Sequence, residues 1–221
     1  MKICILIPAY NESQAVGRLV KEIVALGLDV LVVDDGSSDG TGDIAKTNGA
    51  TVLTNVTNHG KGYSLQRGFD YILSSDYDAL ITMDGDGQHA VNDLANFSHL
   101  FEQKKPDIIC GNRMRNSNGM PGLRFVTNKV MSALISVVCR QKIYDTQCGY
   151  RLIKTEVLRN IQVSSSAFEI ESEVLIKACK KGYRVVSVPI QTIYSKERSK
   201  INPFFDTIRF IIYIIRELFV R

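Results

Sequence analysis

The chain has 221 residues, of which 45% are hydrophobic and 23% are charged, and its formal net charge is +4. This balance is typical of a single folded α/β domain and excludes a disordered chain or a coiled coil. Its 5 cysteines form no CxxC pair, which disfavours a disulfide framework or a zinc site and favours reduced thiols in a cytosolic compartment.

The first half of the chain alternates short apolar runs with amphipathic helical patterns. Predicted strands lie at residues 2–8, 29–35, 50–55, 77–84 and 107–112, and predicted helices at 14–26, from 42, at 61–73 and at 91–103. Apolar strands separated by helices are typical of a parallel sheet that is covered on both faces. The sequence therefore predicts an α/β, Rossmann-like, doubly wound and mostly parallel sheet.

The second half is less regular. After Asn112 come a glycine-rich loop, a long apolar helix over 124–139, the segment DTQCGYRLI, a helix near EIESEVLIKACKKG and one or two strands in YRVVSVPIQTIY. We expect residues 1–202 to form one domain. Residues 203–221 are predicted to form an amphipathic helix, which either belongs to the same unit, contacts another subunit or lies in a membrane interface.

No run of consecutive apolar residues approaches the roughly 20 that a membrane span needs. The short apolar run ICILIPA leads directly into YNES without a cleavage pattern, so it is interpreted as the first strand and not as a signal peptide. These features predict a cytoplasmic protein that is soluble or peripheral to a membrane.

The pair Asp84 and Asp86 follows an apolar strand, and residues two apart at a strand end project to the same side. Two close carboxylates repel unless a cation lies beside them. Because Mg²⁺ commonly takes one or two carboxylates and completes its shell with water and phosphate oxygens, the pair predicts part of a metal site that a diphosphate completes. Gly85 would let the ligand approach closely. A polar turn is the alternative, and His89 is either a ligand or a neighbour of the ligands.

A second acidic loop, VVDDGSSDGT, also follows an apolar strand. Asp34 and Asp35 suit the hydroxyl or N–H groups of a nucleoside, whereas Asp39 suits the start of the next helix. In open α/β sheets ligands bind beyond the carboxyl ends of the strands, so we expect both acidic loops to line one crevice. Lys61, in NHGKGYS, lies near this crevice or is a solvated loop residue.

Six motifs in this order resemble the family 2 glycosyltransferases of GT-A fold. They are IPAYNE (7–12), VVDDGSSDGT (32–41), NHGKGYSLQRG (58–68), MDGDGQH (83–89), GNR (111–113) and DTQCGYR (145–151). The chain is most similar to members that transfer a sugar to dolichyl or polyprenyl phosphate. The resemblance covers residues 1–200.

The resemblance implies roles for individual residues, and it implies Mg²⁺ or Mn²⁺ as the cofactor. It assigns nucleotide contacts to Pro8, Tyr10, Glu12 and Asp35; the metal and diphosphate to Asp84, Gly85, Asp86 and Gln88; the acceptor phosphate to Arg113; and the leaving diphosphate to Lys200 with Ser199. Asp86, Arg113 and Lys200 are the residues expected to act in catalysis. Arg198 is a further candidate for substrate binding, although the family's arginine usually lies several residues upstream of that position.

The acceptor class decides what else the site must supply. A lipid phosphate is already anionic near neutral pH and needs cations to hold it, whereas a hydroxyl acceptor generally needs a base. Arg113, Arg124 and Arg151 are candidates for a cationic clamp. Glu169, Glu171 and Glu173 form an acidic cluster, and Glu169 and Glu173, which share one face of a predicted helix, are candidates for a base. An exposed helix start favoured by its dipole is the equal alternative.

These patterns predict an inverting transferase of a hexose, from GDP-mannose or UDP-glucose, to a polyprenyl or dolichyl phosphate at the cytoplasmic face of a membrane. Transfer to a sugar hydroxyl and a non-catalytic sugar-nucleotide binding protein are the alternatives. Expected partners are the nucleotide sugar, the lipid phosphate, the membrane surface and a membrane-anchoring protein or a second copy of the chain. No nucleic-acid partner is expected.

Overall fold

The computed structural model describes residues 1–115, 119–164 and 169–193. The predicted helix over 203–221 and the predicted site residues Arg198 and Lys200 lie outside the described residues.

Within the described residues, 7 strands form one sheet. They are β1 (Ile3–Ala9), β2 (Asp29–Asp34), β3 (Thr51–Thr54), β4 (Ala79–Thr82), β5 (Ile108–Asn112), β6 (Arg151–Lys154) and β7 (Val185–Pro189). Their order across the sheet is β3-β2-β1-β4-β6-β5-β7. Neighbouring strands are parallel except for β6, which runs antiparallel to both β4 and β5. The predicted mostly parallel α/β sheet is confirmed, and β6 is a strand that the sequence patterns did not predict.

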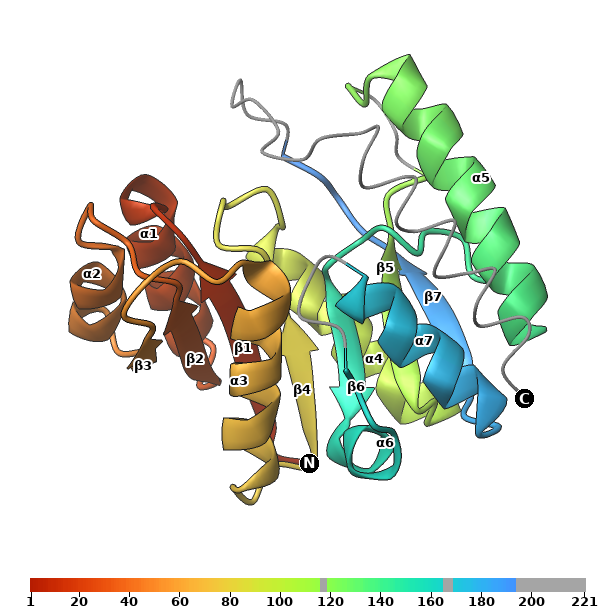
Figure 1. The fold of residues 1–221 in the computed structure, drawn as a ribbon, viewed down its shortest axis with the longest axis horizontal. Coiled ribbons are helices and arrows are strands. Elements are labelled where there is room, and N and C mark those ends of the chain that lie inside the picture. Colours follow the sequence, from red (N-terminus) through yellow and green to blue (C-terminus); the bar gives the residue numbers. More distant parts are fainter. Residues whose placement is uncertain (116–118, 165–168, 194–221) are drawn as a thin grey trace.

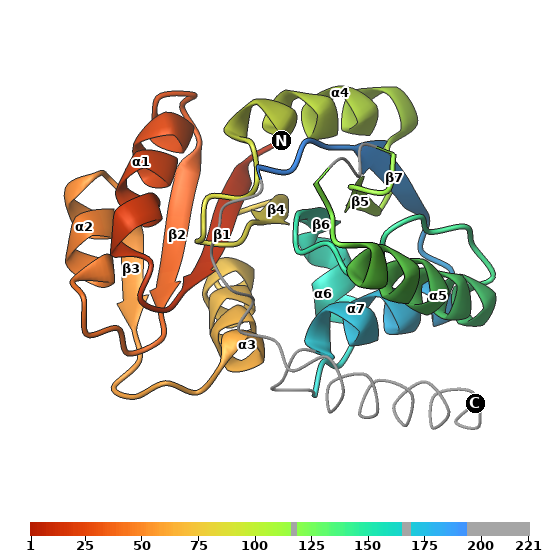
Figure 2. The ribbon, with the colours of Figure 1, turned by 90° about the horizontal axis from the view of Figure 1, so that it is seen from above.

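Helices cover both faces of this sheet (Figures 1 and 2). They are α1 (Ser13–Val24), α2 (Thr41–Thr47), α3 (Lys61–Leu73), α4 (Leu94–Lys104), α5 (Gly122–Cys139), α6 (Thr155–Asn160) and α7 (Ile170–Lys180), with a 3₁₀ turn η1 (Val91–Asp93) before α4. The helices α1 and α4 pack on one face and α3, α6 and α7 on the other. The helix α5 packs against α7.

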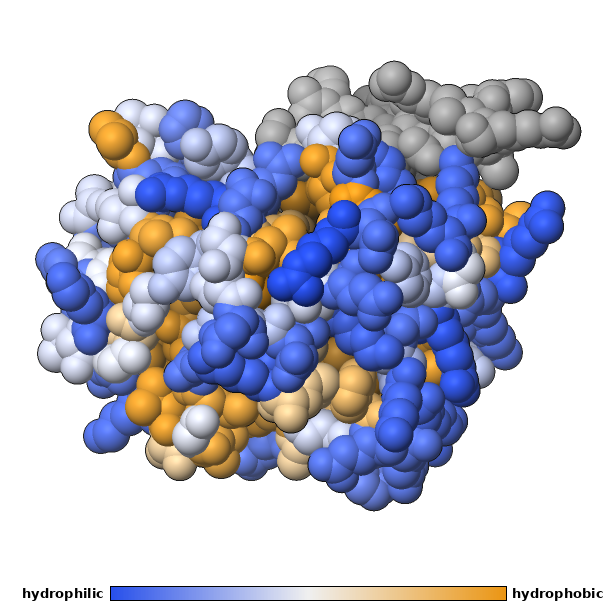
Figure 3. Space-filling model, turned by 90° about the horizontal axis from the view of Figure 1, so that it is seen from below, coloured by the Kyte–Doolittle hydropathy of each residue, from blue (hydrophilic) through white to orange (hydrophobic). Residues whose placement is uncertain are grey.

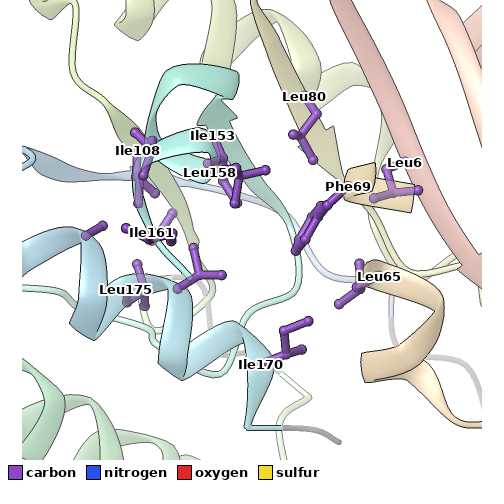
Figure 4. Close-up of a cluster of buried hydrophobic side chains, with 14 of the residues drawn as sticks. Leu6, Leu65, Phe69, Leu80, Ile108, Ile153, Leu158, Ile161, Ile170 and Leu175 are labelled. Carbon is purple, nitrogen blue, oxygen red and sulfur yellow. The ribbon is translucent and has the colours of Figure 1, made fainter. Parts of the chain in front are cut away.

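The two-sided core follows from the alternation of side chains along each strand. In β1, Ile5 and Ile7 point to the face covered by α1 and α4, whereas Cys4 and Leu6 point to the face covered by α3. Figure 4 shows the second of these clusters, in which side chains from α3, α6 and α7 meet those of the sheet. Because both faces are buried, β1 is apolar at every position, as the sequence predicted.

The direction of each strand decides which loops share an edge of the sheet. The parallel strands β1, β2, β4 and β5 end at the same edge, so their following loops gather there. Because β6 runs the opposite way, the loop that precedes it, residues 145–150, comes to this edge as well. The motif DTQCGYR therefore joins the acidic loops in space, although it precedes a strand.

The opposite end of the molecule has a mixed surface, on which charged side chains interrupt the apolar areas (Figure 3). A surface hollow of about 500 Å³ lies at this end, lined by residues that include Asp76, Tyr77, Lys154 and Arg159. It is far from the acidic loops, which lie at the carboxyl edge of the sheet.

Candidate active site

The loop after β1 is fastened to the second acidic loop. Asn11, with a positive φ of 54°, donates its backbone N–H to Ser37 Oγ at 2.9 Å and accepts the N–H of Ser38 at 3.0 Å. The N–H of Glu12 donates to Thr41 Oγ1 at 2.9 Å. These bonds give the loop that holds Tyr10 and Glu12 a fixed place beside the end of β2, with Pro8 buried in β1.

Asp35 organises the loop before α3. Its buried carboxylate accepts the side-chain amide of Asn55 at 2.6 Å and the backbone N–H groups of His59 at 3.1 Å and Gly60 at 2.7 Å. A carboxylate has about four acceptor positions, so one remains for a ligand. Asp35 thus also fixes the backbone from which Lys61 projects.

The loop after β4 is a tight turn closed by its own polar groups. The N–H of Asp84 donates to His89 Nδ1 at 3.2 Å, and the N–H of Gln88 donates to Asp86 Oδ1 at 2.9 Å. The carbonyl of Gln88 accepts the N–H of Ile193 at 2.9 Å, which ties the turn to the chain beyond β7. Asp84 is therefore held through its backbone N–H, and Asp86 through its carboxylate.

Lys61 joins the turn to α7. Its ammonium lies 2.6 Å from Asp84 Oδ1 and 3.0 Å from Glu171 Oε1. Of the two carboxylates on this helix it is Glu171 that reaches the site, whereas Glu173 is buried and accepts Lys177 at 2.5 Å and the N–H of Ser164 at 3.0 Å. Lys61 and the acidic cluster were expected from sequence, but the pair proposed as a base was Glu169 with Glu173, whereas the contact with Lys61 is made by Glu171.

The carboxylates of Asp84 and Asp86 concentrate negative charge in the turn. Burial alone would raise the pKa of Asp84, but the neighbouring Lys61 holds that pKa well below its usual range. Burial, together with the charge of Asp84, raises the pKa of Asp86 to about 6. Burial lowers the pKa of His89 to about 4, so this imidazole is neutral and accepts a hydrogen bond at Nδ1.

A divalent cation fits this set of groups. The described residues contain no cluster of three or more His, Cys, Asp or Glu side chains that could hold a metal by themselves. One or two carboxylates suffice for Mg²⁺ when a diphosphate supplies further oxygens. The raised pKa of Asp86 beside an ionised Asp84 indicates a place where a cation is favourable.

Gly149 brings the loop before β6 against these carboxylates. A Cβ at this position would lie 2.9 Å from Asp84 Oδ1 and 3.0 Å from Glu171 Oε1. Gly149 is also fixed to β4, because Thr82 Oγ1 donates to the carbonyl of Gly149 at 2.6 Å. Gly85 is similarly close to β1, with Pro8 O at 3.3 Å from an added Cβ.

The two predicted arginines differ in their surroundings. Arg113 is buried at the end of β5 and forms two side-chain bonds with Asp145, of 2.7 Å and 3.0 Å. Its positive charge also acts on Asp84. It therefore lies in the site region, with one charge already balanced by Asp145.

Arg151 points into the interior. Its guanidinium donates to the backbone carbonyls of Cys148 at 2.8 Å, Glu171 at 2.5 Å and Thr146 at 2.6 Å, and the residue is 1% exposed. A side chain in this position shapes the 145–150 loop and the start of α7 and does not reach a substrate. We therefore assign Arg151 a supporting role in place of the substrate contact expected from sequence. Arg124 lies in the first turn of α5.

Comparison with known proteins agrees with the fold and the motifs. A family model described as glycosyl transferase family 2 matches residues 4–162. The undecaprenyl-phosphate mannosyltransferase of Micrococcus luteus is 31% identical, over 86% of this chain and 83% of the relative. The dolichyl-phosphate beta-glucosyltransferase of Dictyostelium discoideum is 25% identical, over 96% of this chain and 72% of the relative.

Solved structures give the same fold. Glucosyl-3-phosphoglycerate synthase from Mycobacterium tuberculosis, in complex with Mn²⁺, UDP and phosphoglyceric acid, superposes with a TM-score of 0.73 at 18% identity, covering 98% of this chain and 77% of the other. The chain belongs to glycosyl transferase family 2 and has the GT-A fold.

Proposed function

We propose that this enzyme transfers a hexose, with inversion, from a nucleoside-diphosphate sugar to a polyprenyl or dolichyl phosphate at the cytoplasmic face of a membrane. The observation that carries the proposal is the pair Asp84 and Asp86 at the edge of the sheet, where charge repulsion and burial create a demand for a cation. The relatives named for transfer to lipid phosphates support the acceptor class.

A divalent cation, Mg²⁺ or Mn²⁺, would be held by Asp84 and Asp86 next to Gln88. When bound, such a cation stabilises the charge of a leaving diphosphate as a Lewis acid. Asp35 and the fastened loop of Tyr10 and Glu12 suit the nucleoside. Outside the described residues, Lys200 is proposed to add positive charge to the leaving group, and Arg198 is proposed as a further substrate-binding residue.

The ion pairs of the α7 carboxylates favour an acceptor that needs no base. Glu171 is paired with Lys61 and Glu173 with Lys177, and an ion-paired carboxylate is a weak base for a hydroxyl. A phosphate acceptor needs no base, and Arg113, although it is paired with Asp145, is proposed to contact it. These contacts support transfer to a phosphate over transfer to a sugar hydroxyl.

The surface of α5 supports a membrane partner. Its exposed face carries a continuous apolar stripe at steps of 3 or 4 residues: Leu123, Val126, Val130, Leu134 and Val137, which are 77%, 57%, 54%, 42% and 73% exposed. Its buried face includes the polar residues Asn128 and Ser132. A helix with its apolar side outward suits a lipid surface, and the pattern of residues 203–221 suits the same surface.

Among the described residues α5 is the one helix whose length and composition would allow it to cross a membrane, and 22% of it is buried. Core helices of soluble proteins meet the same criteria. Because one side of α5 packs on α7, we propose that it lies along the membrane surface.

The test is transfer of label from a panel of radiolabelled donors, including GDP-mannose and UDP-glucose, to polyprenyl phosphate in vesicles. We expect label in the lipid phase with one donor, and loss of at least about 100-fold of the rate in chelator or in Asp86→Ala, because the cation provides most of the charge stabilisation. Label found only in a water-soluble product would contradict the lipid acceptor. An unchanged rate in chelator would contradict the metal site.

A further inference from the structure

The ammonium of Lys61 lies where a metal ion is expected to act. It contacts Asp84, which we assign to the metal, at 2.6 Å, and Glu171 on the other side at 3.0 Å. The side chains of Lys61, Asp84 and Glu171 are 23%, 32% and 16% exposed, so the group is partly shielded from water. The described structure thus neutralises an expected metal ligand with a cation of its own.

A divalent cation at Asp84 and this ammonium repel each other. Binding of the ion therefore weakens the contact of Lys61 with Asp84, while the contact with Glu171 is retained. The backbone cannot follow, because Asp35 holds the N–H of Gly60 at 2.7 Å immediately before Lys61. The lysine side chain has a flexible four-carbon stem, so it can move without the backbone.

The two carboxylates are held more firmly than the lysine. Gly149 packs against both of them, and a Cβ there would come within 2.9 Å and 3.0 Å of their oxygens. The backbone of Asp84 is fixed by His89 at 3.2 Å, and the carbonyl of Glu171 is held by Arg151 at 2.5 Å. The mobile member of the trio is therefore the ammonium.

We propose that Lys61 is a displaceable counter-ion of Asp84, and that Glu171 is the positioning residue that keeps Lys61 at the site when the divalent ion and the donor diphosphate bind. This inference rests on the proposed function for the identity of those two ligands. In this proposal Lys61 pairs with Asp84 when the divalent ion is absent and with the donor diphosphate when the ion is bound. Lys61 keeps its contact with Glu171 in both states.

The first test measures Mn²⁺ binding to the full chain without turnover, by electron paramagnetic resonance of the free ion. Lys61→Met is expected to raise the affinity for Mn²⁺ in the absence of nucleotide by about fivefold, the effect of removing a partly exposed ion pair. Arg18→Met is the matched control, because Arg18 lies beside Gly87 of the same turn and pairs with Glu22, not with Asp84. It is expected to change the affinity by less than about twofold. An equally small change in Lys61→Met would overturn the proposal.

The second test separates positioning from simple electrostatics. Removing a negative charge near an anionic ligand should strengthen its binding, whereas loss of a residue that positions Lys61 should weaken it. We expect Glu171→Gln to weaken the binding of GDP or UDP to the Mn²⁺-loaded chain by about threefold when Lys61 is present, and not in the Lys61→Met background. Stronger or unchanged binding in Glu171→Gln would overturn the role of Glu171.

Circular dichroism checks that each variant is folded, and Lys61→Gln replaces Lys61→Met if the latter does not fold. If the unsubstituted chain binds neither Mn²⁺ nor a nucleoside diphosphate, the proposed function fails and this inference fails with it. If it binds both and the variants behave as their controls do, the inference alone fails.

Discussion

His89 is a buried histidine held neutral within the turn of the two aspartates. Its Nδ1 accepts the N–H of Asp84 at 3.2 Å, and its ring stacks on Tyr150 with a centroid distance of 4.9 Å. Tyr150 in turn packs on Phe97 of α4. The imidazole therefore supports the turn through its shape and one acceptor, and no described contact requires its protonated form.

This environment predicts a pH dependence of stability. Since burial lowers the pKa of His89 to about 4, the unfolded chain binds a proton more readily, and the contribution is present above about 6.5 and is lost as the pH falls toward 4. The full loss is about 3 kcal/mol. Urea unfolding without metal at pH 7 and pH 5 should show a smaller decrease for His89→Asn than for the unsubstituted chain. The exposed His99 provides the control, and His99→Asn should keep the full decrease.

A second prediction at this scale concerns the buried pair Arg113 and Asp145. Asp145 is 0% exposed and accepts three hydrogen bonds from Arg113. Asp145→Asn should lower the free energy of unfolding by about 3 kcal/mol, because it leaves a buried guanidinium without its counter-ion. Asp76→Asn, which breaks the exposed pair with Lys2 at 2.6 Å, should have little effect. Equal effects in urea unfolding would show that Arg113 is not committed to Asp145.

At the scale of elements, the contact between α3 and β1 depends on a glycine within a helix. A Cβ at Gly68 would lie 2.3 Å from Leu6 Cδ1 and 2.7 Å from Cδ2, and Leu6 is buried. Helix propensity alone favours alanine by about 1 kcal/mol, yet the clash should outweigh it.

Gly68→Ala is therefore expected to lower the free energy of unfolding by about 1–3 kcal/mol. Gly122→Ala, in the first turn of α5 with nothing within 4 Å of the added Cβ, is the control and should be neutral or slightly stabilising. A neutral Gly68→Ala in chemical denaturation would mean that α3 can move away from β1 at no cost.

The elements differ in how far the sequence could predict them. β1, β2 and β4 are apolar at successive positions and α1 is strongly amphipathic, so the strands, their helices and the edge that carries Asp84 follow from sequence. β6 could not be predicted, since four residues, Arg151–Lys154, carry no period that distinguishes a strand, and its reversed direction is set by pairing with β4 and β5. That reversal is also why the contact of Gly149 with Asp84 and the buried position of Arg151 were missed.

At the scale of the whole molecule, two surfaces differ in chemical character. The carboxyl edge of the sheet holds the acidic turns, whereas α5 presents its apolar stripe at the side remote from β3 (Figure 1). Under the proposed function, the donor approaches this edge from water and the acceptor approaches it from a lipid surface.

This division predicts that membrane association depends on α5. The double substitution Val126→Glu and Val130→Glu should reduce co-sedimentation with anionic phospholipid vesicles by at least about fivefold, because two charges would enter the apolar layer. Val56→Glu is the control, since Val56 is 97% exposed beyond β3, away from α5. If the double variant sediments with vesicles as fully as the control, α5 does not contact the membrane.

The place of β6 in the sheet also sets an order in time. The ribosome synthesises β5 before β6, yet in the sheet β6 lies between β5 and β4. Until Arg151–Lys154 have been synthesised, β4 remains an open edge and β5 has no strand to pair with on that side. The turn of Asp84 and Asp86 is synthesised early. The loop of Gly149, which packs against this turn, is synthesised only shortly before β6. During translation the turn of Asp84 and Asp86 therefore remains incomplete until Gly149 and β6 have been synthesised.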